Sequence, residues 1–154
     1  DCDLTMTQTL THSPAQIIRK LLLDQGLAAS SGDWQCFYGK EPNSPDNVIS
    51  TFCTAGKGFW SAMVNGELMG HEGFQIRVRG KSYLTAHRRA DKIQTELAEV
   101  VYQQVVTIVE DSVTYQYLIA AIGGIGDVLD NGADDTPAAR HVFTINCTAS
   151  IEEL

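Results

Sequence analysis

Residues 74–93 have the sequence F-Q-I-R-V-R-G-K-S-Y-L-T-A-H-R-R-A-D-K-I, in which a strand, a break and a helix follow one another. Apolar and polar residues alternate over Phe74–Arg79, which is typical of a strand with one buried face. Gly80 interrupts this pattern, and Ser82 can cap a helix. From Ala86 onward, apolar residues recur at alternating steps of four and three, as in a helix that lies on a sheet.

A helix and two strands are predicted upstream of this stretch. Ser13 can act as the N-cap of the helix, with a proline in the first helical position and Gln16 completing a capping box. Gly26 is placed to end the helix in the left-handed conformation. The double-proline turn E-P-N-S-P-D-N then separates the two predicted strands, Trp34–Tyr38 and Val48–Cys53.

The segment Thr54–Gly73 is predicted to be a long, partly mobile loop, because five glycines are spread through it. Phe59 and Trp60 are bulky apolar residues within this predicted loop. They could pack beneath the loop, or they could face a partner, so both are candidate interface residues.

Three further strands are predicted in the second half of the chain: Val105–Val109, Thr114–Ile122 and His141–Cys147. The first is nearly all apolar, and it is therefore predicted to be a central strand covered on both faces. Residues 123–137 have the acidic sequence G-G-I-G-D-V-L-D-N-G-A-D-D-T-P, which predicts an exposed loop.

The predicted order is therefore helix, three strands, helix, three strands. This order indicates an α+β fold in which two helices pack on one face of a mixed, mostly antiparallel sheet of about five or six strands. A length of 154 residues is sufficient for one hydrophobic core. We expect a single domain over residues 1–154, with residues 1–12 as an extended N-terminal arm.

Composition excludes some classes of function. The net charge of −8, from 11 basic and 19 acidic residues, argues against a protein that grips phosphate backbones. No apolar run reaches the roughly 18 residues of a membrane-spanning helix, so no membrane partner is expected. The four cysteines are widely spaced, lack metal-ligand spacing and are interpreted as buried free thiols. The four histidines lie far apart, and each is predicted to be a surface or loop residue.

The glycine cluster Gly123–Gly126 follows a predicted strand, as phosphate-binding loops do. No Lys-Ser/Thr pair follows it, and the aspartates within Asp127–Asp135 would repel phosphate, so nucleotide binding is not expected. An EF-hand alignment of this segment places Leu129 and Ala138 where oxygen ligands are required. A weak cation site of another type remains an alternative. No catalytic residue, metal or cofactor is predicted.

Basic residues are concentrated around the strand and helix of residues 74–93. These are Arg77, Arg79, Lys81, Arg88, Arg89 and Lys92. They could form a solvated surface, or they could contact the acidic segment of a neighbouring copy in a head-to-tail ring, which closes when the rotation divides a full turn. The candidate subunit or partner interface comprises Arg77, Arg79, Arg88, Arg89, Asp127, Asp130, Asp134, Asp135, Phe59 and Trp60.

Four segments carry a resemblance to a known family: S-P-A-Q-I-I-R-K-L-L-L, E-P-N-S-P-D-N, Q-I-R-V-R-G-K-S-Y and V-F-T-I-N. Together they span nearly the whole chain, which resembles the minor capsid or tail terminator proteins at the head–tail junction of long-tailed bacteriophages. The chain is similar to lambda-like tail terminators. The resemblance implies helices packed on one mixed sheet and supplies no catalytic residue.

The same resemblance implies a structural virion protein of the neck, made in the host bacterial cytoplasm. Such a protein caps the tail tube as a ring, expected to be a homohexamer, ends tail polymerisation and provides the surface for head docking. The implied partners are other copies of the chain, the major tail-tube protein and a head-completion or connector protein. Duplex DNA would pass through the lumen without sequence-specific binding.

Two alternatives remain open at this point. The chain could be another head–tail connector, such as a head-completion adaptor. It could also be a small enzyme or ligand-binding domain that uses Thr54–Gly73 as a lid over a pocket.

Overall fold

The computed structural model describes residues 10–61, 68–99, 101–123, 125–137 and 139–154. Two helices lie within these residues: α2 (Pro14–Asp24) and α3 (Tyr83–Glu99). The strands are β1 (Gln35–Tyr38), β2 (Val48–Ser61), β3 (Leu68–Gly80), β4 (Tyr102–Glu110), β5 (Val113–Gly123), β6 (Leu129–Ala133) and β7 (His141–Glu153). Neither described helix is long and apolar enough to cross a lipid bilayer.

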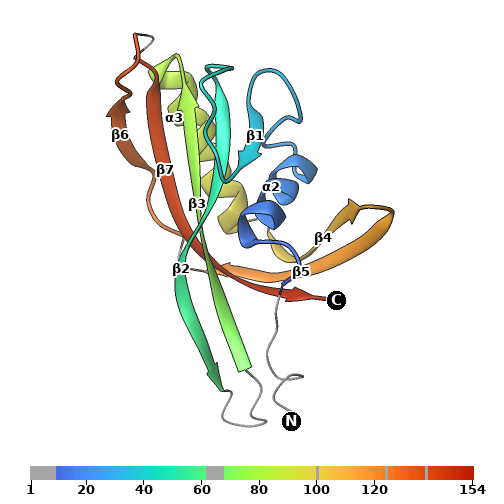
Figure 1. Cartoon of the computed structure of the whole chain (residues 1–154). Helices are drawn as coiled ribbons and strands as arrows, with labels where there is room; N and C mark the ends of the chain where they lie inside the picture. Colours follow the sequence, from blue (N-terminus) through green and yellow to red (C-terminus); the bar gives the residue numbers. More distant parts are fainter. Residues whose placement is uncertain (1–9, 62–67, 100, 124, 138) are drawn as a thin grey trace.

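The seven described strands form one sheet with the order β1-β2-β3-β7-β5-β4, and β6 also pairs with β7 (Figure 1). β1 is parallel to β2, and every other pairing between these strands is antiparallel. The long strand β7 lies beside β3 and also pairs with β6 near its start and with β5 near its end. The α+β fold with a mixed, mostly antiparallel sheet is thus confirmed, with one strand more than the upper expectation.

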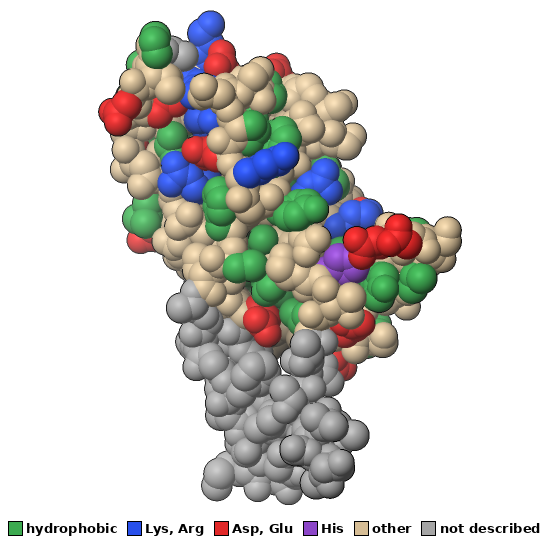
Figure 2. Space-filling model, viewed as in Figure 1, with side chains coloured by type: hydrophobic (Ala, Val, Ile, Leu, Met, Phe, Trp, Pro, Cys, Tyr) green, Lys and Arg blue, Asp and Glu red, His purple; other side chains and the backbone are tan. Residues whose placement is uncertain are grey.

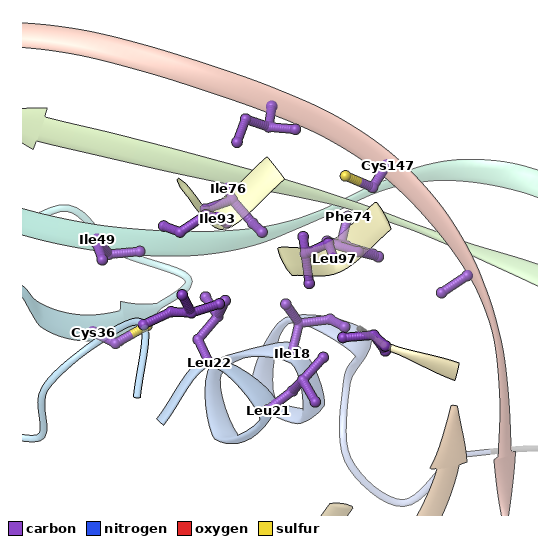
Figure 3. Close-up of a cluster of buried hydrophobic side chains, with 14 of the residues drawn as sticks. Ile18, Leu21, Leu22, Cys36, Ile49, Phe74, Ile76, Ile93, Leu97 and Cys147 are labelled. Carbon is purple, nitrogen blue, oxygen red and sulfur yellow. The ribbon is translucent and has the colours of Figure 1, made fainter. Parts of the chain in front are cut away.

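The two helices share one core with the sheet (Figure 3). α2 contributes Ile18, Leu21 and Leu22, which are buried as its apolar stripe predicts. α3 contributes Ile93 and Leu97 to the same core. The facing strand residues are Ile49, Phe74, Ile76 and Cys147. Alternation over Phe74–Arg79 therefore identified the buried face of β3 correctly.

Local signals set both ends of α2, and a close contact places α3 against β3. The Ser13 backbone N–H donates to Gln16 Oε1 at 2.9 Å, and the Gln16 N–H donates to Ser13 Oγ at 3.3 Å, so the predicted capping box of α2 is confirmed. Gly26 follows α2 with φ of +72°. Before α3, a Cβ at Gly80 would lie 2.9 Å from the Ala86 Cβ, so glycine is required for the close approach of β3 and α3.

The loop prediction for Thr54–Gly73 is wrong over most of its length. β2 continues to Ser61, and β3 begins at Leu68, so the two strands form a long hairpin that projects from the rest of the molecule (Figure 1). The register shifts between Thr54 and Gly58. Glycine weakens a strand without preventing backbone pairing, and here the bulge accommodates the glycine-rich part. Residues 62–67 of the predicted loop lie outside the described residues.

The prediction that Val105–Val109 is a central strand is also wrong. β4 is an edge strand that, among the described strands, pairs with β5 alone. Val106 is fully buried on one face, whereas Val105 is 48% and Val109 is 66% exposed on the other. A continuous apolar run predicts two covered faces only when other elements cover them, and here the second face lacks a described neighbour.

Two boundaries of the C-terminal region also differ from expectation. The predicted loop at 123–137 contains β6, whose residues are all exposed. Its sequence L-D-N-G-A lacks strand periodicity, and backbone pairing to β7 supplies the strand geometry instead. β7 continues to Glu153, beyond the predicted end at Cys147.

The predicted N-terminal arm is packed where the structure describes it. His12 is only 4% exposed, and the Thr11 backbone N–H donates to Glu153 Oε1 at 2.8 Å. Residues 1–9 of the predicted arm lie outside the described residues. Thr11 and His12 are thus held against β7 and β5.

Candidate interaction surfaces

Two arginines are buried on the face of the sheet away from the helices. Arg79 and Arg140 are each 3% exposed. Arg79 donates to the carbonyl oxygens of Asp46 at 3.2 Å and Pro45 at 2.7 Å. Arg140 donates to both the carbonyl and the side-chain oxygen of Asn43 and lies 3.3 Å from Asp46 Oδ1. These guanidinium groups therefore tie the double-proline turn to β3 and β7.

Asp134 completes the contacts of Arg140. Arg140 Nε lies 2.9 Å from Asp134 Oδ2, and Asp134 Oδ1 accepts from Thr136 Oγ at 2.7 Å and from the Arg140 backbone N–H at 2.9 Å. Partial burial acts to raise the pKa of Asp134, but the hydrogen bonds from Thr136 and Arg140 and the positive charge of Arg140 outweigh it and lower this pKa to about 2. Asp134 thus acts as an internal ion-pair partner.

Two more members of the basic group also have partners inside the chain. Arg77 Nε lies 3.1 Å from Glu41 Oε2. Arg89 donates to the Leu27 carbonyl oxygen at 3.2 Å, and its guanidinium carbon lies 4.9 Å from the centroid of the Trp34 ring. The positive charges of Arg77 and Arg89 stabilise the fold, because their partners belong to the same chain.

The remaining candidate charges are accessible. Arg88 is exposed on α3, and Asp127 and Asp135 are exposed beside β6. Asp130 is also exposed, and its Oδ2 accepts from the Tyr83 hydroxyl at 3.0 Å. The structure therefore brings the acidic strand β6 beside the start of α3 within one copy.

Phe59 and Trp60 occupy paired positions of β2, opposite Gly70 and Met69 of β3. Their side chains lie outside the described residues. The structure moves both residues from a predicted loop to the projecting β2–β3 hairpin.

The sequence did not single out a cluster around His12. His12 Nδ1 lies 2.5 Å from the Tyr117 hydroxyl, and Nε2 lies 3.2 Å from Glu110 Oε1. Burial first, and then the negative charge of Glu153, raises the pKa of Tyr117. His12 therefore contradicts the prediction of a surface histidine, whereas His87 is exposed as predicted. Only the neighbouring capping signal at Ser13 hinted that the chain is ordered here.

The described cysteines are free. Cys36 and Cys147 are buried as expected, and burial raises the pKa of each thiol to about 12. Cys53 is exposed, so the prediction of burial is wrong for this residue. No group of three or more His, Cys, Asp or Glu side chains in the described part of the chain is placed to hold a metal ion.

A groove of about 550 Å³ opens beside the edge strand β1 and α2. Its lining consists of Arg19, Gln35, Cys36, Phe37, Tyr38 and Lys40. The Arg19 guanidinium carbon lies 6.0 Å from the centroid of the Tyr38 ring, and Lys40 Nζ lies 5.6 Å from that of Phe37. The groove thus combines aromatic walls with two positive charges.

The β4–β5 hairpin presents a different surface at the other edge of the sheet. Its turn residues Asp111 and Ser112 have φ of 51° and 65°. The apolar side chains of Val105, Val109 and Val113 are each about half exposed or more. In Figure 2, hydrophobic and acidic side chains gather at this projecting end of the molecule.

Comparison with known proteins gives one family match that spans most of the chain. Residues 21–152 match the family described as bacteriophage tail terminator protein. The chain belongs to this family. No curated protein matches the sequence.

One solved structure supports the same fold for this tail terminator family member. A chain from the "Virion of native gene transfer agent (GTA) particle" aligns with a TM-score of 0.50 and 15% sequence identity. The alignment covers 88% of this chain and 91% of that chain. The family assignment confirms the resemblance found in the sequence and indicates a structural role in the phage tail.

Proposed function

We propose that this tail terminator family member caps the phage tail tube as a homohexameric ring in the neck of the virion. The ring ends tail polymerisation and provides the surface on which the head docks. Its protein partners are other copies of itself, the major tail-tube protein and a head-completion or connector protein. The role is structural and not catalytic. The observation that carries the proposal is the family match over residues 21–152.

The charge of the chain supports a lumen for DNA. Duplex DNA crosses the proposed ring during ejection, and a net charge of −8 per copy disfavours adhesion to its phosphates. Basic residues that would attract DNA are partly removed from the surface, because Arg79 and Arg140 are buried and paired within the chain. The ring would therefore allow DNA to pass without sequence-specific binding.

The accessible candidate charges remain available for virion contacts. Arg88 on α3 and Asp127, Asp130 and Asp135 around β6 are proposed to contact neighbouring copies or virion partners. Phe59 and Trp60 stay candidates on the projecting hairpin. The projecting β2–β3 and β4–β5 hairpins and the exposed strand β6 offer surface for such contacts.

The direct test combines solution mass with tube capping. Light scattering of the purified protein, alone and with assembled tail tubes, should detect a hexamer or hexamers formed on tube ends. Addition of the protein to polymerising tail-tube subunits should stop tube growth, and electron micrographs should show a ring at one end. A strict monomer that leaves tube ends unchanged and tube growth unaffected would contradict the proposal.

A further inference from the structure

The groove beside β1 has positive charge without internal neutralisation. Arg19 donates to the Cys36 carbonyl oxygen at 2.8 Å, and Lys40 lies over Phe37. Neither cation has a carboxylate within ion-pair distance among the described residues. Tyr38 is 47% exposed at the groove wall. A volume of about 550 Å³ falls in the range of about 300–1,000 Å³ for binding sites. The groove therefore suits a small acidic and apolar group.

The tip of the β4–β5 hairpin has the complementary chemistry. Glu110 and Asp111 are both exposed at the turn, and the flanking Val109 and Val113 are 66% and 49% exposed. The Glu110 carboxylate contacts only His12 among the described residues, and its side chain is 58% exposed. Two carboxylates therefore lie beside exposed valines at one narrow turn, with Val113 on the same face as Glu110 and Val109 on the opposite face.

The two edges of the sheet differ in how their backbone groups are satisfied. At β1, the Cys36 N–H donates to the Ala29 carbonyl and the Cys36 carbonyl accepts from Arg19, so the chain covers this edge itself. At β4, the two-residue turn makes Glu110 and Val113 a hydrogen-bonded pair. Alternate backbone groups, at Val109 for example, therefore point outward, and no described residue pairs with them.

We infer that the β4–β5 hairpin of one copy docks in the β1–α2 groove of the next copy, which is the contact that builds the proposed ring. Val113, which lies on the same face of the hairpin as its partner Glu110, would lie against Tyr38, while Glu110 and Asp111 would face Arg19 and Lys40. This inference rests on the proposed ring.

Charge and symmetry favour a second copy in this head-to-tail arrangement. The groove and the hairpin belong to different strands at the two ends of the sheet order, β1 and β4, so their contact joins two different surfaces, as in a heterologous interface. Pairing of two β4 hairpins would instead bring acidic tips together, and like charges at an interface weaken association. Each copy is negatively charged overall, but the basic groove of one copy attracts the acidic hairpin tip of the next at the contact itself.

Charge reversal at two exposed positions tests the contact. Lys40→Glu and Asp111→Lys should each raise the concentration for half-assembly by about tenfold or more, because a close interfacial charge pair is reversed. The double variant should restore assembly toward the wild-type value. Lys92→Glu on α3 is a matched control that should assemble like wild type. Light scattering over a concentration series measures all four, and thermal melting verifies that each variant is folded.

A cross-link gives a second, independent readout. In a background with Cys2 and Cys53 replaced by serine, Tyr38→Cys with Val113→Cys should form intermolecular disulfides on oxidation and give a ladder of covalent oligomers. Thr85→Cys with Val113→Cys serves as control and should give no ladder beyond a dimer. If the Val113→Cys variant alone forms disulfide-linked dimers as fast as the wild-type protein assembles, two hairpins pair with each other. That result would overturn the inference.

The outcomes separate this inference from the proposed function. Suppose that wild-type rings form, that both charge-reversed variants assemble as well as wild type, and that the Tyr38→Cys, Val113→Cys variant gives no ladder. The hairpin–groove contact is then wrong, and the proposed ring stands. If wild-type protein forms no ring, alone or on tail tubes, the proposed function fails and the inference fails with it.

Discussion

Two parts of the structure differ from the usual pattern in which charged side chains are exposed and apolar side chains are buried: the surroundings of Arg140 and the β4–β5 hairpin. Around Arg140, charged side chains are buried and bonded to one another and to the backbone of the double-proline turn. On the β4–β5 hairpin, valines are exposed to solvent. The candidate interface charges Arg79 and Asp134 have partners within the chain, whereas valines of a strand predicted to be covered on both faces lie on the surface. Composition alone therefore does not identify which surface is free to bind.

The largest effect is expected from Arg140→Ala. Removal of this guanidinium leaves Asp134 and the Asn43 carbonyl without their buried partner. Breaking a buried ion pair costs about 3–5 kcal/mol of unfolding free energy. Urea unfolding should reveal this loss. Arg88→Ala, at an exposed position, should change the unfolding free energy by no more than about 0.5 kcal/mol. Equal losses in the two variants would contradict the structural role of Arg140.

Asp134→Asn should change the pH dependence of stability. The pKa of Asp134 is about 2 in the folded state and 3.8 ordinarily, so its ionised form contributes stability above about pH 4. This contribution is lost as the pH falls through about 2. The variant should therefore be less stable than wild type at pH 7, with a difference that shrinks between pH 4 and 2. A constant difference across this range, in thermal melts at each pH, would count against the ion pair.

Substitutions of two valines on β4 test the difference in burial between the two faces of the hairpin. Val106 is fully buried, so Val106→Thr places a hydroxyl in the core and should cost about 1–3 kcal/mol. Val109 is 66% exposed, and Val109→Thr should change the unfolding free energy by less than about 0.5 kcal/mol. Chemical denaturation of dilute, unassembled protein measures both. Similar costs would mean that the outer face of β4 is covered within one copy.

The smallest effect is expected at the hairpin turn. Ser112 has φ of 65°, a left-handed conformation that glycine adopts more readily than serine. Ser112→Gly should therefore raise the unfolding free energy by about 0.5–1 kcal/mol. Ser82→Gly, before α3, provides the contrast, because the Thr85 backbone N–H donates to Ser82 Oγ and no left-handed conformation is relieved there. A gain at Ser82 instead of Ser112 would contradict the hairpin geometry.

Sequence patterns predicted those parts of the fold that depend on neighbours a few residues apart. The capping residues Ser13 and Gln16 define the start of α2, since their partners lie within one helical turn. Alternation over Phe74–Arg79 and the stripe beginning at Ala86 identify buried faces for the same local reason.

The exposure of the candidate interface residues could not be predicted from the sequence, because it depends on distant segments. Arg79 is buried by the double-proline turn, and Asp134 is held by Arg140, while Arg88 alone among the four candidate arginines is exposed and lacks a described partner. The sequence pattern around the four arginines does not distinguish the exposed Arg88 from the buried Arg79. A strand position shows only which face a side chain occupies and not what covers that face.

The amino-acid sequence by itself determined two amphipathic helices, most of the strands and the family resemblance, because periodicity and capping are encoded in adjacent residues. Only the tertiary structure decided that β4 is an edge strand, that β6 pairs with β7, and that Arg79 and Arg140 are buried. Burial is a property of contacts between segments far apart in the chain. The same side chain can therefore stabilise the core or face a partner, depending on which segment lies over it.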